Sequence, residues 1–264
     1  MKIAIIGGNR FIGKKVVETL IDNKHDITIF NRSKSGHSKA KVIKFDRDED
    51  KIDLKKFDCI IDMCLYTLKQ FKLIKKYIPK KKHYIFISTG AIKYKKAFGP
   101  YAIEKEKIEK ALAKTNLNYD IVRPSYVVGY GNHIPRLDYF VTFLSEGREI
   151  ALPDGKGDYP INLVLVNDVA AAINRIISFK GKRENTLYNV CGSKSTTINE
   201  IIDIIKEELD IKEHKTVDSL ASVFMNQVFE MDNTDTKKLL NMRFTSIKSI
   251  IKVFLKEWRE SKVS

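Results

Sequence analysis

The chain has 264 residues, of which 43% are hydrophobic and 31% are charged, as is usual for a globular protein with a hydrophobic core. No apolar run approaches the roughly 18 residues that a membrane span needs, and the start of the chain lacks the apolar region and cleavage site of a signal peptide. We therefore expect a cytoplasmic protein without a membrane partner.

The formal net charge of +15 is compatible with binding to nucleic acid or to a phosphorylated substrate. However, the lysines are spread along the whole chain, with only short clusters such as Lys80-Lys81-Lys82. This distribution favours solvated faces, so we expect no nucleic-acid partner and keep RNA binding as the alternative.

The three cysteines, Cys59, Cys64 and Cys191, are an odd number, and two of them lie in apolar, strand-like segments. We expect reduced, buried thiols. No group of cysteines and histidines has the spacing of metal ligands, so no metal site is expected.

Predicted strands and helices alternate through the first half of the chain. Residues 3–6 form a continuous apolar run, which is typical of a strand buried on both faces. Further strands are predicted at 26–30, 42–45, 58–63, 83–88 and 118–122, and helices at 11–21, 68–77 and 101–114. This order predicts the α/β class, with a Rossmann-type doubly wound parallel sheet and right-handed crossovers.

The alternation loosens after Arg123-Pro124. Strands are predicted at 161–166 and 187–190, and helices at 137–146, 169–177 (with Asp168 as the N-cap), 197–209, 233–240 and 246–258. We predict a dinucleotide-binding core over 1–130 and a smaller C-terminal α+β substrate lobe over 131–264. Segments around 161–190 are expected to return to the core.

A glycine-rich turn joins the first strand to the first helix, and its sequence is Gly7-Gly8-Asn9-Arg10-Phe11-Ile12-Gly13. Glycine permits the tight turn and the close approach of backbone to a pyrophosphate, and the last glycine lets the helix pack closely on the strand. The helix start then directs its N–H groups and its dipole toward the phosphates. All seven residues are predicted to bind a dinucleotide.

The end of the second strand indicates which dinucleotide is bound. An NAD site usually has an acidic residue there, whereas this chain has Asn31-Arg32-Ser33-Lys34. Arg32 is suited to a 2′-phosphate, and Arg10 is placed to help from the turn. We therefore predict NADP as the cofactor, with NAD as the alternative.

Other cofactor residues are predicted at later strand ends. Asp46 follows the third strand and is placed to accept a hydrogen bond from the adenine amino group, although a simple turn is nearly as good an interpretation. Arg47 and Met63 are included in the predicted cofactor site.

Five segments in order resemble the extended short-chain dehydrogenase/reductase superfamily, also called the NAD-dependent epimerase/dehydratase family. They are the glycine turn, Phe-Ile-Ser-Thr-Gly-Ala at 86–91, Tyr-Ala-Ile-Glu-Lys at 101–105, Val-Arg-Pro-Ser-Tyr-Val-Val-Gly at 122–129 and Val-Asn-Asp-Val-Ala at 166–170. Residues 232–240 are also similar to a C-terminal helix of this family.

The resemblance implies a catalytic set of Thr89, Tyr101 and Lys105, with Ser88 as the alternative hydroxyl. Tyr101 and Lys105 are four residues apart and share a helix face. A nearby ammonium favours a phenolate, so we expect Lys105 to lower the pKa of Tyr101, which then acts as general acid and base. The resemblance also implies that Lys105 binds the nicotinamide ribose and that Pro124 and Ser125 line the nicotinamide pocket.

Several positions depart from this family. Gly90-Ala91 replaces the acidic pair of the sugar 4,6-dehydratases, and residues 159–162 lack the arginine that often holds a nucleotide-sugar diphosphate, for which Arg136 and Arg148 are substitutes. Arg10 replaces the middle glycine, as in a branch that includes chloroplast RNA-binding members.

We predict an NAD(P)-dependent oxidoreductase or epimerase that acts on a small molecule with a sugar-like hydroxyl or ketone, or on a nucleotide sugar. By analogy with the superfamily, a homodimer is expected. The alternative is a non-catalytic dinucleotide-binding or RNA-binding protein of the same fold.

Overall fold

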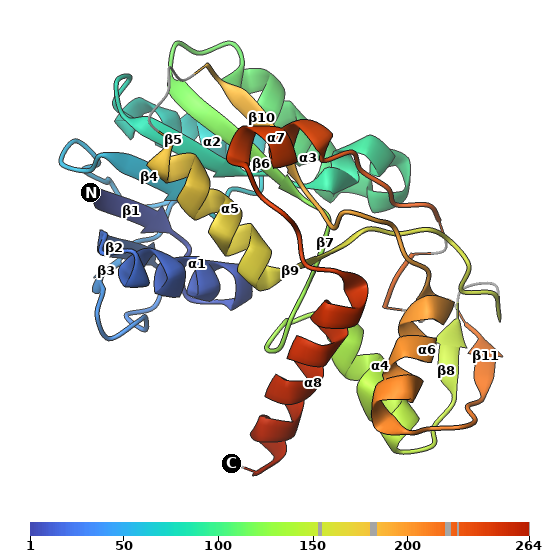
Figure 1. The fold of residues 1–264 in the computed structure, drawn as a ribbon. Helices are drawn as coiled ribbons and strands as arrows, with labels where there is room; N and C mark the ends of the chain where they lie inside the picture. Colours follow the sequence, from blue (N-terminus) through green and yellow to red (C-terminus); the bar gives the residue numbers. More distant parts are fainter. Residues whose placement is uncertain (153–154, 180–183, 220–222, 226, 264) are drawn as a thin grey trace. The chain divides into compact units, whose positions relative to one another are not determined.

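The structure is a computed structural model that describes residues 1–152, 155–179, 184–219, 223–225 and 227–263 (Figure 1). Within these ranges, every helix is too short or too polar to cross a membrane. The chain forms two compact units, each assembled from three segments. Unit 1 comprises Met1–Pro124, Asn167–Val190 and Thr234–Met242, and unit 2 comprises Ser125–Val166, Cys191–Asn233 and Arg243–Ser264.

Unit 1 is built on a sheet of seven described strands that all pair in parallel. Their order is β3-β2-β1-β4-β5-β6-β10, so the order reverses at β1 and β4. The predicted doubly wound Rossmann-type sheet is confirmed. The strands are β1 (Lys2–Ile6), β2 (Asp26–Asn31), β3 (Lys41–Lys44), β4 (Cys59–Asp62), β5 (His83–Ile87), β6 (Asn118–Pro124) and β10 (Thr186–Val190).

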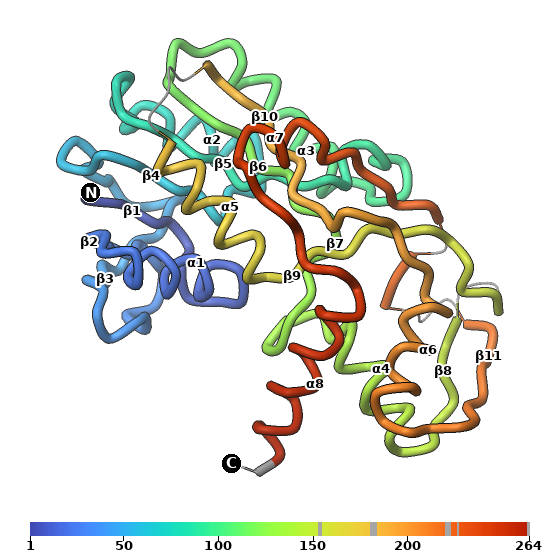
Figure 2. The backbone as a smooth tube through the Cα atoms, in the orientation of Figure 1, coloured from blue at the N-terminus to red at the C-terminus, as the bar shows by residue number. Residues whose placement is uncertain are grey.

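Helices cover the two faces of this sheet. Figure 1 shows α1 (Phe11–Asp22) and α5 (Val166–Ser178) on one face, while α2 (Leu68–Ile74) and α3 (Lys95–Leu112) pack together on the other. The short helices η1 (Lys75–Tyr77) and η2 (Gly90–Tyr94) adjoin α2 and α3. Figure 2 shows the late segments β10 and α7 (Thr234–Leu240) returning to the sheet formed by the start of the chain.

Two predicted helix starts are wrong. α3 begins at Lys95 rather than at Tyr101, but it is interrupted at Gly99, whose φ is +58°, and Pro100 then opens the part that carries Tyr101. α5 begins at Val166, so Asp168 lies inside its first turn and is not the N-cap. An acidic residue there still stabilises the positive end of the helix dipole.

Among its described residues, unit 2 combines two small parallel strand pairs with three helices. β7 (Tyr126–Val128) pairs with β9 (Leu163–Leu165), and β8 (Ile150–Leu152) pairs with β11 (Thr216–Asp218). The helices α4 (Arg136–Ser145), α6 (Ile198–Leu209) and α8 (Ile247–Val263) contact one another. Thr197 and Glu200 close a reciprocal capping box at the start of α6, in accord with the helix start predicted at residue 197.

A buried ion pair joins the loop after β3 to the end of β4. Arg47 donates to both carboxylate oxygens of Asp62, at 2.7 and 2.6 Å, and the two side chains are 6% and 0% exposed. The Tyr84 hydroxyl of β5 also donates to Asp62, at 3.0 Å. Burial by itself lowers the pKa of Arg47, but the charge and hydrogen bonds of Asp62 outweigh it and raise the pKa.

We predict that Asp62→Asn destabilises the protein by about 3–5 kcal/mol, because the Arg47 charge stays buried without its counter-charge. The free energy of unfolding from urea titration measures this loss. Glu18→Gln is the matched control, since Glu18 pairs with Lys15 at 3.0 Å but both side chains are about 30% exposed, and it should cost less than about 1 kcal/mol. Equal losses in the two variants would contradict the prediction.

Candidate functional site

The predicted site residues gather at one edge of the unit 1 sheet. Because the strands are parallel, their carboxyl ends lie at the same edge, where doubly wound folds bind ligands. Gly7 follows β1, Arg32 follows β2, Met63 follows β4, Thr89 lies two residues beyond β5, and Pro124 is the last residue of β6. The edge includes the point between β1 and β4 at which the strand order reverses.

The glycine turn packs too closely for side chains. Gly7 has a φ of +89° and donates to the carbonyl of Phe30 at 3.0 Å. A Cβ atom on Gly13 would lie 2.5 Å from the Gly7 carbonyl oxygen and 3.0 Å from the Gly8 Cα. Glycine at these positions therefore lets α1 begin directly against the turn.

The start of α1 has the features of an anion site. Arg10 precedes the helix in an extended conformation, and its side chain makes no capping hydrogen bond. Phe11 has a φ of +32°, a left-handed conformation that costs a non-glycine residue roughly 1–2 kcal/mol. The first N–H groups of a helix have no partner within it, so those of Phe11 and Ile12 suit a phosphate.

Two asparagines tie the loop after β2 to the turn. Asn31 accepts a hydrogen bond from the Gly8 N–H at 3.2 Å. The Asn9 side chain donates to the hydroxyls of Ser33 and Ser35, at 3.2 and 3.1 Å. Arg32 lies exposed on this loop, and its guanidinium makes no hydrogen bond or ion pair with any residue that the structure describes.

Asp46 and Arg47 have partners of their own in this structure. Asp46 accepts a hydrogen bond from the Asp48 N–H at 3.0 Å. This bond closes a simple turn, which is the alternative to adenine binding that the sequence analysis gives for Asp46. Arg47 is held by Asp62 rather than exposed at the sheet edge. Direct binding of a cofactor by Asp46 or Arg47 stays a prediction.

Thr89, Tyr101 and Lys105 lie close together in unit 1. The Thr89 side chain is near enough to the Tyr101 hydroxyl to lower the pKa of that phenol. Lys105 is 2% exposed, donates to the Ile87 carbonyl at 2.8 Å, and lies 5.8 Å from the centre of the Tyr101 ring. Tyr101 itself is 44% exposed, so a substrate has access to its side chain.

The expected effect of Lys105 on Tyr101 is wrong for this structure. Burial around the hydroxyl raises the pKa of Tyr101, the hydrogen bond from Thr89 opposes this, and the nearby Tyr66 adds to the rise. Burial lowers the pKa of Lys105 itself to about 8, although the Asp62 charge opposes that shift. The ammonium is thus costly to keep charged, and it is directed at a backbone carbonyl.

The structure brings Thr89, not Ser88, to Tyr101. Ser88 is buried and donates to Glu109, which also accepts from Arg123 Nε at 2.9 Å. The strand pairing of the Ser88 N–H with the Val122 carbonyl, at 2.7 Å, fixes this orientation.

The sequence does not predict one neighbour of Thr89, Tyr101 and Lys105. The ring of Tyr66 lies 5.3 Å from Lys105 Nζ. In its ionised form, Tyr66 raises the pKa of Tyr101. Burial raises the pKa of Tyr66 itself. Its position soon after the carboxyl end of β4 was the available signal, because such loops line the ligand edge.

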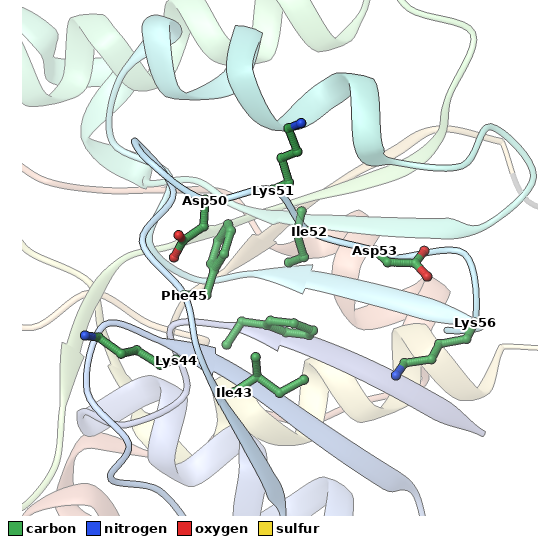
Figure 3. A pocket seen from close by; sticks show the side chains of 9 residues that line it. Ile43, Lys44, Phe45, Asp50, Lys51, Ile52, Asp53 and Lys56 are labelled. Carbon is green, nitrogen blue, oxygen red and sulfur yellow. The ribbon is translucent and has the colours of Figure 1, made fainter.

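A pocket elsewhere in unit 1 contains none of the predicted site residues. This hollow has a volume of about 360 Å³. In Figure 3, charged side chains surround Ile43, Phe45 and Ile52. No group of three or more potential metal ligands occurs among the residues described.

Comparisons with solved structures show the fold. A UDP-glucose 4-epimerase from Thermotoga maritima, solved with UDP-glucose, aligns with a TM-score of 0.80 and 21% identity over 99% of this chain and 100% of that one. A UDP-glucuronic acid 4-epimerase from Bacillus cereus, solved with UDP-glucuronic acid and NAD, gives a TM-score of 0.81 and 15% identity over 98% and 99%. A dTDP-glucose 4,6-dehydratase from Bacillus anthracis, solved with NAD, gives 0.77 and 16% over 98% and 97%.

Sequence comparisons give two further relatives, and no family model matches the chain. The chloroplast stem-loop binding protein of 41 kDa b from Arabidopsis thaliana is 27% identical over 75% of this chain, and the match spans 60% of that relative's length. A candidate UDP-glucose 4-epimerase from Methanocaldococcus jannaschii is 25% identical over 80% of this chain and 83% of the relative. With the sheet order and the glycine turn, these similarities establish that the chain has the fold of the NAD-dependent epimerases and dehydratases, the extended short-chain dehydrogenases/reductases.

Proposed function

We propose that the chain is an NAD(P)-dependent oxidoreductase or epimerase that acts on a sugar-like hydroxyl or ketone, or on a nucleotide sugar. The observation that carries the proposal is the cluster of Thr89, Tyr101 and Lys105 at the same sheet edge as the glycine turn. The fold supports it, because relatives of that fold are named as nucleotide-sugar epimerases. A cytoplasmic location and a homodimer stay predictions from the sequence.

The residues at the turn fit a dinucleotide. At Gly7, Gly8 and Gly13 a Cβ atom would clash with neighbouring protein atoms, so only glycine allows this tight turn, and the start of α1 offers free N–H groups to a pyrophosphate. In the proposal, Lys105 holds the nicotinamide ribose. When bound, the nicotinamide supplies the hydride chemistry.

Tyr101 is the proposed acid and base. In its phenolate form it takes the proton from a substrate hydroxyl in one direction, and in its phenol form it gives the proton to a carbonyl oxygen in the other. Thr89 lies beside the same hydroxyl, and in the proposal it restricts where the substrate oxygen can bind. Since burial raises the pKa of Tyr101, the cofactor-free protein keeps this group protonated at neutral pH.

We predict that the protein binds NADP more tightly than NAD, because Arg32 is exposed and unpaired among the described residues while no carboxylate ends β2. Parallel calorimetric titrations with the two dinucleotides measure the difference. Arg32→Gln should weaken NADP binding by about tenfold or more and leave NAD binding unchanged. If the wild-type protein bound both dinucleotides with equal affinity, the proposed role of Arg32 would be wrong.

Tyr101→Phe should lower turnover by about 10²–10⁴-fold, because it removes the proton-transferring oxygen, and should leave dinucleotide binding intact. Turnover is followed by NMR on UDP-glucose and UDP-glucuronic acid with each dinucleotide. Tyr77→Phe is the control, since Tyr77 lies in η1 outside the site. Unchanged turnover by Tyr101→Phe would refute the mechanism.

A second candidate function is the binding of structured RNA. The Arabidopsis relative is named as a stem-loop binding protein, and the net charge of this chain is +15. In unit 1, a surface hollow of about 650 Å³ is lined by Lys75, Lys76, Lys80 and Lys114. Four ammonium groups around one hollow suit a phosphate backbone.

For this candidate, we predict that affinity for an RNA stem-loop falls linearly with the logarithm of salt concentration. Changing the four lysines to glutamine should lower both the affinity and the salt slope, as measured by fluorescence anisotropy. Wild-type affinity and slope in this variant would exclude the hollow as the RNA site.

A further inference from the structure

Aromatic rings surround the ammonium group of Lys105 in unit 1. Its Nζ lies 4.9 Å from the ring centre of Phe86 and 5.8 Å from that of Tyr101. The ring centre of Tyr66 lies 5.3 Å from the same atom. A cation within about 6 Å of a ring centre is attracted to the face of that ring. With these rings around it, Lys105 is only 2% exposed.

Of these three rings, that of Tyr66 has the most freedom to move. Phe86 is a fully buried residue of β5. Tyr101 lies on the same helix as Lys105, and its hydroxyl is beside Thr89. Tyr66 lies in the loop between β4 and α2 and is 52% exposed. Exposed side chains change rotamer rapidly, so Tyr66 can move without disturbing a strand or a helix.

The backbone around Tyr66 is anchored, so this movement is confined to the side chain. The Tyr66 N–H donates to the side-chain oxygen of Gln70 at 3.0 Å. Thr67 caps the start of α2, because its hydroxyl accepts from the Gln70 N–H at 3.2 Å. Rotation about the side-chain bonds of Tyr66 is therefore enough to uncover Lys105.

The donors of Lys105 are only partly used within the chain. One of them bonds the Ile87 carbonyl at 2.8 Å, and an ammonium has three. Among the described residues, Lys105 has no other hydrogen bond and no ion pair. The rings attract its charge but offer no oxygen lone pair. The remaining donors suit the oxygen atoms of a ligand, provided that the ring of Tyr66 moves aside.

Tyr66 also lies within electrostatic range of the glycine turn. Burial raises the pKa of Tyr66, and the charge of Arg10 in that turn opposes the rise. Tyr66 in turn acts on Tyr101 and raises its pKa. The side chain that covers Lys105 thus lies near both the proposed pyrophosphate site and the proposed acid and base.

We propose that Tyr66 controls access to Lys105: its ring covers the ammonium, and rotation of the ring admits the hydroxyl oxygens of a dinucleotide ribose. The ribose rests on the proposed function, whereas the cover rests on the contacts of Tyr66 alone. Because binding must displace the ring, Tyr66 slows the association of the dinucleotide. Tyr66 is therefore a positioning residue that acts through Lys105 and not on the reacting atoms.

Acetylation of lysine amines with sulfosuccinimidyl acetate, followed by peptide mass spectrometry of the full chain, tests the cover. Only the neutral amine reacts, so labelling rates are measured from about pH 7 to about pH 10. The plateau of the rate reports access to the amine, and the midpoint reports its pKa. Tyr66→Ala should raise the plateau of Lys105 by about tenfold or more. Tyr66→Phe keeps the ring and should match the wild-type protein.

Tyr77→Ala is the matched control. The ring of Tyr77 lies 5.1 Å from Lys76 Nζ, but Lys76 is exposed. Loss of this ring should therefore change the labelling of neither Lys76 nor Lys105. An equal rise at Lys105 in this control would indicate a general loosening of the fold and would overturn the proposal.

Three further results would overturn the cover. They are wild-type labelling of Lys105 in Tyr66→Ala, labelling of Tyr66→Phe as fast as that of Tyr66→Ala, and failure of both Tyr66→Ala and Tyr66→Ser to fold. The second result would assign the protection to the hydroxyl group of Tyr66, and the third would assign the ring to the stability of the fold.

Stopped-flow titration with NADP and NAD tests the ligand. Tyr66→Ala should bind the dinucleotide faster than the wild-type protein and Tyr66→Phe, and the bound dinucleotide should protect Lys105 from labelling in Tyr66→Ala. Protection without faster association would overturn control of access by Tyr66. If the labelling differences persist but no dinucleotide binds or protects Lys105, the proposed function is refuted, and with it the ribose as the ligand.

Discussion

The ligand edge of unit 1 depends on the buried pair between Arg47 and Asp62. Asp62 is the last residue of β4, and its carboxylate draws together the loop after β3, through Arg47, and β5, through Tyr84. Its neighbour Cys64 packs so closely on the turn that a Cβ atom on Gly7 would lie 2.8 Å from the thiol sulfur. The shape of the glycine turn therefore depends on a buried ion pair. Loss of that pair would make the surface proposed to bind the pyrophosphate less well ordered.

Much of unit 1 could be predicted from the sequence because the relevant signals are local. Short apolar runs bounded by turns, such as residues 3–6, identify strands buried on both faces, and their alternation with helices dictates a parallel sheet. The four-residue spacing of Tyr101 and Lys105 likewise fixes a shared helix face. These signals need no knowledge of distant residues, and the fold class that follows from them is confirmed.

The remaining features depend on contacts between distant residues. Asp62 lies 15 residues from Arg47, and nothing around either one marks them as partners, so the sequence predicts Arg47 as a cofactor residue without revealing its ion pair. The direction of the Tyr101 pKa depends on how much protein surrounds its hydroxyl, which spacing does not reveal. α5 begins before Asp168 because the chain passes from β9 directly into the helix, so the residue that precedes the helix belongs to the strand.

The interleaving of the two units affects how the protein is made. Unit 1 takes β10 from residues 186–190 and α7 from residues 234–240, so a ribosome must synthesise most of the chain before this unit is complete. Until β10 emerges, β6 has an uncovered edge of backbone N–H and C=O groups, and such edges pair readily with other chains. During synthesis, the edge of β6 is thus exposed for a period in which chaperones would have to cover it. Because each unit consists of three separate segments, neither can be produced as one continuous fragment.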